Sequence, residues 1–160
     1  MKNIDFENLE YNECFGYEGE ISINFFGKDM NVYFTVNVED EEIADMQYET
    51  YEKFKEKWKE LQKEIAEKII KYYNEEEKGS YGPEEKERFD KWWPEINTID
   101  ELLNQIEIDG IIIPEADVAG ERRIYLTFNK KYGNDTEDNG IGVKIVNEEV
   151  TEIGFKDIAF

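Results

Sequence analysis

The chain has 160 residues, enough for one domain with a sizeable core, and its 39% hydrophobic and 14% aromatic content argues against disorder although 37% of residues are charged. Its 40 acidic and 19 basic side chains give a net charge of −21, which disfavours binding to DNA, RNA or anionic membranes. There is no histidine and one cysteine, which excludes histidine-dependent triads, an internal disulfide and thiolate-rich zinc sites. We therefore expect no cofactor. Because no apolar stretch reaches signal-peptide or membrane-spanning length, we also expect a cytoplasmic location.

The N-terminal part of the sequence predicts a β-hairpin. Residues 20–26 alternate apolar and polar side chains, which is typical of a strand with one buried face. Residues 27–29 supply turn chemistry, and the β-branched and aromatic residues of 31–38 indicate a second strand. Residues 11–16 show a weaker strand pattern ahead of this hairpin.

A long amphipathic helix is predicted over residues 45–73. Apolar residues recur there at spacings of three and four, and they form one stripe: Tyr51, Phe54, Trp58, Leu61, Ile65, Ile69 and Tyr72. About 29 residues at a rise of 1.5 Å would span roughly 43 Å. A compact domain of this size is only about 40 Å across. The helix should therefore cross the whole sheet, overhang it or bend.

Shorter elements are predicted after the long helix. Residues 75–83, which are rich in Glu, Gly and Ser, predict a mobile loop. Residues 84–93 predict a short helix, and residues 98–101 form a capping box that begins another. Of the pair Trp92 and Trp93, we expect one side chain in the core and the other partly exposed, although such a pair can also be an interface anchor.

The remaining sequence predicts four strands, at residues 107–113, 122–128, 140–147 and 150–155. Strands and helices do not alternate regularly along the chain. This order indicates an α+β fold, with an antiparallel sheet of about six strands and with one long amphipathic helix and one or two short helices packed on it. We expect a single domain spanning residues 1–160.

The surplus of acidic residues is concentrated toward the two ends of the chain. Residues 1–50 carry 13 acidic and 2 basic side chains, a net charge of −11, and residues 101–160 carry 13 and 6, a net charge of −7. A dense acidic group precedes the long helix: Glu39, Asp40, Glu41, Glu42 and Asp45. This group can be a solvated helix start, which the helix dipole favours, or a surface for a basic partner. A second candidate patch comprises Asp135, Glu137 and Asp138.

Residues 134–140 also resemble the beginning of a calcium-binding loop. With Asp135 at position 1, Glu137, Asn139 and Gly140 occupy positions 3, 5 and 6 of an EF-hand loop. Position 12 is Val146 instead of a bidentate Glu, and the flanking segments are predicted strands. A turn rich in Asn, Asp and Gly explains the same residues. The pattern favours a turn and leaves metal binding by this loop open.

The C-terminal third contains the segments Tyr125-Leu-Thr-Phe128, Asn139-Gly-Ile-Gly-Val143 and Val150-Thr-Glu-Ile-Gly-Phe-Lys-Asp-Ile158. Their succession resembles an uncharacterised bacterial domain family with a Gly-x-Gly-Val segment and a strand that ends in Gly-x-x-Asp. The Trp-Asp pair usual in such domains is missing here, and Asn139 replaces their usual His. Because such domains are associated with toxin–immunity loci, the resemblance implies an immunity protein.

These observations predict a non-enzymatic, acidic binding protein, and most specifically a bacterial immunity protein that neutralises a basic, nuclease-type toxin by direct docking. A nuclease must be basic to hold its polyanionic substrate, so an acidic inhibitor is attracted to it. The predicted contacts are the two acidic groups named above. Two alternatives stay open: a metal-dependent or carboxylate-based hydrolase, supported only by the surplus of Asp and Glu, and a regulatory domain. The oligomeric state is also left open.

Overall fold

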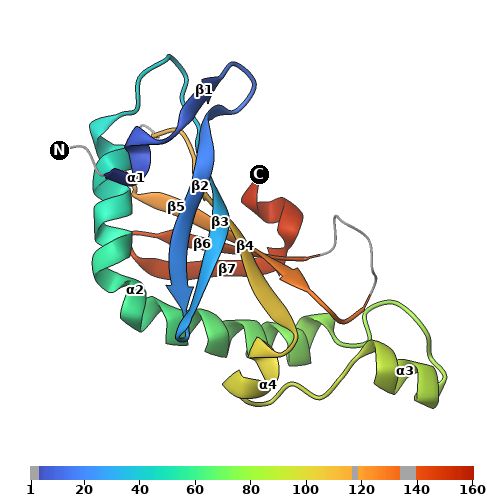
Figure 1. Cartoon of the computed structure of the whole chain (residues 1–160). Helices are drawn as coiled ribbons and strands as arrows, with labels where there is room; N and C mark the ends of the chain where they lie inside the picture. Colours follow the sequence, from blue (N-terminus) through green and yellow to red (C-terminus); the bar gives the residue numbers. More distant parts are fainter. Residues whose placement is uncertain (1–3, 117–118, 134–139) are drawn as a thin grey trace.

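The computed structural model describes residues 4–116, 119–133 and 140–160. Within these residues, seven strands form one sheet in which their spatial order follows the chain. The strands are β1 (Glu10–Asn12), β2 (Gly16–Phe25), β3 (Lys28–Val36), β4 (Ile106–Ile113), β5 (Arg123–Lys130), β6 (Gly140–Val146) and β7 (Glu149–Phe155). Neighbouring strands are antiparallel, except that β3 and β4 are parallel. Figure 1 shows that the sheet is strongly twisted.

The helical elements are mostly inserted between β3 and β4. They are α1 (Ile4–Glu7), α2 (Asp45–Tyr72), the π-helical turn η1 (Tyr73–Glu77), α3 (Lys86–Trp92), α4 (Ile99–Leu103) and the 3₁₀ turn η2 (Lys156–Ala159). The long helix α2 leads away from the end of β3 and returns the chain to the opposite end of the sheet, where β4 begins (Figure 1).

The predicted α+β class, with one long helix and short helices, is confirmed, whereas the sheet differs slightly from the predicted antiparallel sheet of about six strands, in two respects. First, the short edge strand β1 adds a seventh strand to the described sheet by pairing with the start of β2. Second, β4 runs parallel to β3 because α2 carries the chain back to the end at which β3 began. A crossover of this kind is the usual way to join two parallel strands.

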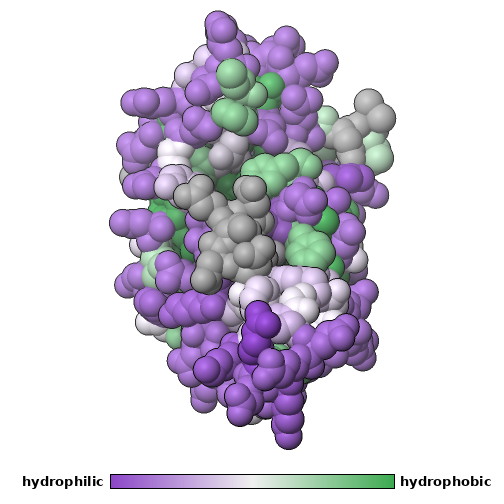
Figure 2. All heavy atoms as spheres, turned by 90° about the vertical axis from the view of Figure 1, so that its right-hand side faces the viewer, coloured by the Kyte–Doolittle hydropathy of each residue, from purple (hydrophilic) through white to green (hydrophobic). Residues whose placement is uncertain are grey.

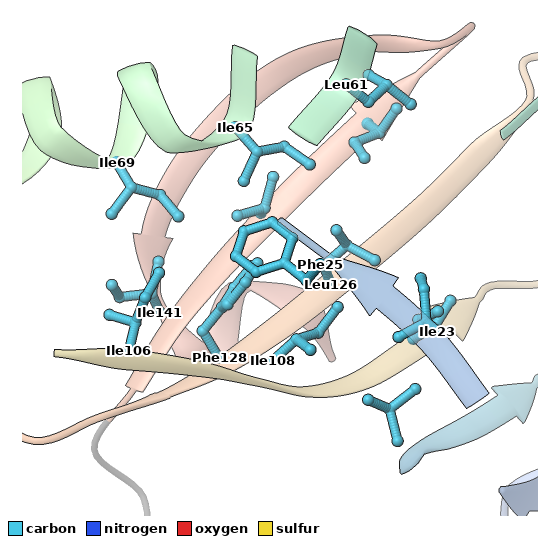
Figure 3. Packing of buried hydrophobic residues seen from close by; sticks show 14 of the residues in the cluster. Ile23, Phe25, Leu61, Ile65, Ile69, Ile106, Ile108, Leu126, Phe128 and Ile141 are labelled. Carbon is cyan, nitrogen blue, oxygen red and sulfur yellow. The ribbon is translucent and has the colours of Figure 1, made fainter. Parts of the chain in front are cut away.

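The helix α2 packs one apolar stripe against the sheet, as predicted. Figure 3 shows Leu61, Ile65 and Ile69 pointing from the helix toward the sheet residues Leu126 and Phe128, and all five side chains are buried. In Figure 1 the helix curves as it follows the twisted sheet, so a bend, one of the three alternatives expected for its length, is observed.

The segment after α2 differs from its prediction. Residues 75–83 were expected to form a mobile loop. Residues 78–83 contain no helix or strand, but helical structure continues through η1 to Glu77, and the Lys78 N–H donates to the Tyr73 carbonyl at 2.7 Å. Glu77 is only 1% exposed at the end of this turn. The predicted division of the tryptophan pair is confirmed, because Trp93 is 1% exposed and packs near the ring of Tyr73, while Trp92 is partly buried.

Three buried tyrosines give the fold a predictable response to alkali. Burial raises the pKa of Tyr51, Tyr73 and Tyr132 well above 10.0, and the hydrogen bond to Asp5 for Tyr51 and the charge of Glu77 for the other two add to this effect. Unfolded tyrosines lose their proton near a pKa of about 10. The folded state therefore retains protons that the unfolded state loses, and stability should be complete below about pH 10 and fall as the pH rises further.

Urea unfolding followed at increasing pH, together with tyrosinate absorbance, measures this effect. We expect the ionisation of these three phenols to coincide with loss of the circular dichroism signal of the fold. The variant Tyr51→Phe should unfold with fewer tyrosinates formed. Full ionisation of all tyrosines near pH 10 in a folded chain would contradict the prediction.

Candidate docking site

The segment between β3 and α2 is held at the end of the sheet by one buried side chain. Gln47 is 2% exposed, and its Nε2 donates to the carbonyl oxygens of Asn37 at 2.6 Å and Pro114 at 2.9 Å. Its Oε1 accepts from the Ala44 N–H at 2.9 Å. Gln47 thereby ties both ends of the acidic segment 37–45 to the chain that follows β4.

Three adjoining hollows surround this segment. The first, of about 380 Å³, lies between the segment and residues 115–116, and the second, of about 590 Å³, lies toward α1 and the start of α2. The third, of about 690 Å³, lies between the β1–β2 turn, the ends of β3 and β4, and Phe160. We call the third hollow the aromatic groove, and the three together the acidic end.

The acidic end is lined by carboxylates. Among the described residues, nine acidic side chains line the three hollows, and no Lys or Arg does. The nine are Glu7, Glu13, Glu18, Glu39, Asp40, Glu41, Glu42, Asp45 and Glu115. The negative charge of this surface is therefore not balanced by basic side chains in its own lining.

The structure brings the first predicted acidic group together. Glu39, Asp40, Glu41, Glu42 and Asp45 each line at least one of the three hollows, and Glu39, Glu42 and Asp45 each line two. Their role as partner contacts stays a prediction. The second predicted group, Asp135, Glu137 and Asp138, lies outside the described residues, and so does the calcium-like loop apart from Gly140.

Exposed aromatic side chains are concentrated in the groove. Five large hydrophobic residues are exposed in the described part of the chain, and three of them line this hollow: Tyr11 at 44%, Phe15 at 59% and Phe160 at 86%. Thr35 and Ile112, which are paired neighbours on the parallel strands β3 and β4, also line it. Figure 2 shows the face that lies at the right-hand side of Figure 1, where hydrophobic patches stand out on an otherwise hydrophilic surface.

Close packing fixes the turn that carries Phe15. The next residue, Gly16, has a φ of +97°, and a Cβ atom at this position would lie 2.4 Å from the carbonyl oxygen of Val36. Only glycine tolerates both the positive φ and this approach. The β1–β2 turn is thus pressed against the end of β3, and the Phe15 ring projects beside the groove instead of joining the core.

The carboxylates of the acidic end raise the pKa of a tyrosine that lies beside them. Desolvation raises the pKa of the Tyr11 phenol, and the charges of Glu41 and Glu13 raise it further. The ring centroids of Tyr11 and Tyr17 lie 5.4 Å apart. The Tyr17 hydroxyl donates to the Glu41 carbonyl at 2.5 Å. Residues of two different hollows therefore contribute to one negative potential.

The acidic side chains do not converge on a metal geometry. In residues 4–116, 119–133 and 140–160, no group of three or more His, Cys, Asp or Glu residues is placed to hold a metal ion. The described helices also include none that is long and apolar enough to cross a membrane.

A second polar cluster lies in the core and was not predicted from the sequence. The side chains of Lys130 and Glu77 are both 0% exposed and form an ion pair. Glu77 also accepts from the Tyr132 hydroxyl at 2.7 Å, and Lys130 donates to the Tyr81 hydroxyl at 3.0 Å. The Lys130 ammonium lies 5.0 Å from the ring centroid of Tyr132 and 5.7 Å from that of Phe155. Because both charges are sealed from solvent, this cluster fixes η1 to β5 and offers no access to a ligand.

Comparison with known proteins identifies a family for the chain but no activity. No curated protein and no solved structure matches it. One family model matches residues 5–160, and its description assigns no function, so the association with toxin–immunity loci remains a prediction. Because this match covers nearly the whole sequence, the chain belongs to the family described as "Domain of unknown function (DUF6985)".

Proposed function

We propose that the chain is a non-enzymatic binding protein that docks a basic partner protein on its acidic end. The observation that carries this proposal is the lining of the three hollows, in which nine carboxylates and no basic side chain are found among the described residues. Charge of one sign gathered on one surface attracts a partner of opposite charge and speeds its association.

The aromatic groove supports binding as well as attraction. Tyr and other large aromatic residues are enriched among the residues that contribute most to binding energy at protein interfaces. Here Tyr11, Phe15 and Phe160 are exposed beside Glu13 and Glu39, so apolar contact and charge are available on the same surface.

In its most specific form, the proposal is a bacterial immunity protein against a nuclease-type toxin. The basic surface with which such a toxin holds its polyanionic substrate is complementary in sign to the acidic end. Docking there would cover the substrate site of the toxin without any chemical step by the immunity protein. This form is supported by charge complementarity and by the family resemblance of the C-terminal segments.

The test measures association with a panel of purified nucleases, half of them basic and half acidic. We expect binding to basic members alone, with an association rate at least about tenfold lower in 0.15 M salt than in 0.01 M salt, because salt shortens the Debye length from about 30 Å to about 8 Å. Stoichiometric loss of nuclease activity on binding would support the immunity form.

A charge-matched pair of variants locates the effect. The four-residue variant Glu39→Gln, Asp40→Asn, Glu41→Gln, Glu42→Gln removes four charges from the acidic end. The control variant Glu84→Gln, Glu85→Gln, Glu87→Gln, Asp90→Asn removes four exposed charges at and before α3. We expect the first to lower the association rate about tenfold at low salt and the second less than about twofold. Equal losses would show that net charge alone governs association and would contradict the assigned surface.

A further inference from the structure

We infer that the occupant of the aromatic groove is a short extended segment of the partner, with one large apolar side chain between flanking Lys or Arg residues. This inference rests on the proposed function and specifies which chemistry the groove selects. It gives the three hollows different roles. The groove would hold the large apolar side chain of the partner, which we call the anchor, and the other two hollows would contribute negative charge.

The shape of the groove favours a segment over a flat surface. Its volume of about 690 Å³ lies within the range of about 300–1,000 Å³ found for ligand pockets. Phe15 of the β1–β2 turn, Phe160, Thr35 and Ile112 all belong to its lining. A few side chains of an extended segment can enter a hollow of this volume, whereas the flat face of a folded domain would leave it unfilled.

The apolar part of the lining specifies the anchor. Three exposed aromatic residues of the described chain border one hollow, so filling it would remove several large apolar surfaces from water at once. A Trp, Phe or Leu side chain in this hollow would meet a lining that includes these rings and Ile112. Tyr11 can also receive a cation over its face.

The charged part of the lining specifies the neighbours of that anchor. Glu13, Glu18, Glu39 and Glu115 line the same groove, and its described lining contains no Lys or Arg. Glu18 is paired with Thr35, which is paired with Ile112, so the Cα atoms of Glu18 and Ile112 lie two strands, or about 10 Å, apart. In an extended segment, residues two apart point to the same side and lie about 7 Å apart. Cations two residues before and after the anchor would therefore face the carboxylates.

Two synthetic peptides of equal charge test the inference. One is Gly-Lys-Ser-Trp-Ser-Lys-Gly and the other is Gly-Lys-Ser-Ser-Ser-Lys-Gly, each with neutral, blocked ends. Both are titrated into the full chain at low salt, with binding followed by shifts of backbone amide signals in nuclear magnetic resonance spectra. We expect the Trp peptide to bind at least about tenfold more tightly and to shift the signals of Gly16, Ile112 and Phe160.

Matched aromatic variants test which residues of the groove contact the Trp side chain of the peptide. Phe15→Ser should remove most of the tenfold preference for the Trp peptide, and Phe160→Ser should reduce it. Tyr33→Ser should leave it unchanged, because Tyr33 is 64% exposed but lies outside the groove lining. Equal urea midpoints for the parent chain and the variants would show that the fold is intact.

The outcomes separate the inference from the proposed function. Equal affinity for the two peptides, or equal losses in Phe15→Ser and Tyr33→Ser, would overturn the inference while leaving charge-driven docking in place. Binding of basic nucleases without binding of either peptide would also overturn it, because a folded surface would then be required. If neither the peptides nor the basic nucleases bind at low salt, the proposed function itself is wrong.

Discussion

Replacing Lys130 with methionine should lower the free energy of unfolding by about 3–5 kcal/mol, because the Glu77 carboxylate would be left as a buried charge without its counter-ion. The side chains of both residues are 0% exposed, so water cannot take the place of the ammonium without a rearrangement of η1. Among the described residues, the Tyr132 hydroxyl, at 2.7 Å from Glu77, would continue to donate to this carboxylate. Urea denaturation of the parent chain and the variant measures the difference.

A double variant and an exposed ion pair provide the controls. Lys130→Met combined with Glu77→Gln removes both charges, and we expect it to recover at least half of the loss, with a coupling energy that shows in a double-mutant cycle. Lys63→Met breaks the exposed Lys63–Glu67 pair, whose atoms are 3.8 Å apart, and should cost less than about 0.5 kcal/mol. A loss in Lys130→Met no larger than that in Lys63→Met would contradict the structural role of the buried pair.

The position of Lys130 also shows what the sequence could and could not predict. Ile124, Leu126 and Phe128 face the core at alternate positions of β5, and the same alternation places Lys130 on the buried side. The period-2 pattern therefore contained the signal that one charge points inward. Its partner had no such signal, because Glu77 belongs to a run of three Glu residues of which the first two are exposed.

Most regular elements could be predicted from local patterns, whereas the pairing of strands that are distant in the chain could not. The spacing of apolar residues predicted α2 nearly to its ends, and the hairpin from β2 to β3 was predicted from alternation and turn residues. The parallel pairing of β3 with β4 depends on the direction in which α2 returns the chain, which no local pattern records. The edge strand β1 has three exposed residues, so it lacks the one-sided burial by which strands are detected.

One part of the candidate docking site could likewise be predicted from the sequence, and another part could not. The acidic group of residues 39–45 is contiguous and could be predicted, because its charge is visible in the sequence itself. The aromatic groove joins Tyr11 and Phe15, near one end of the chain, to Ile112 and to Phe160, at the other end. The sheet order from β1 to β7 and the return of η2 over β6 bring these parts together only in the folded chain.

The two polar anchors of the fold stabilise different ends of α2. Gln47 lies in its first turn beside the acidic end, and Glu77 is the last residue of η1, the turn that directly follows α2. Figure 1 shows these ends on opposite sides of the molecule. Variants of Lys130 should therefore change stability without changing the charge or the lining of the docking surface, whereas variants of Gln47 act on the segment that forms it.

Gln47→Met keeps the length of the side chain and should lower the free energy of unfolding by about 2–4 kcal/mol, because it removes three hydrogen bonds from a buried position. The carbonyl oxygens of Asn37 and Pro114 and the N–H of Ala44 would lose their partner. The matched control is Gln62→Met on the same helix, which removes one hydrogen bond, from the Phe26 N–H at 2.7 Å, and should cost about 1 kcal/mol. Hydrogen exchange at the Ala44 amide should accelerate in Gln47→Met and remain unchanged in Gln62→Met. Equal losses of stability, with no change at Ala44, would show that the acidic segment is held in place by other contacts.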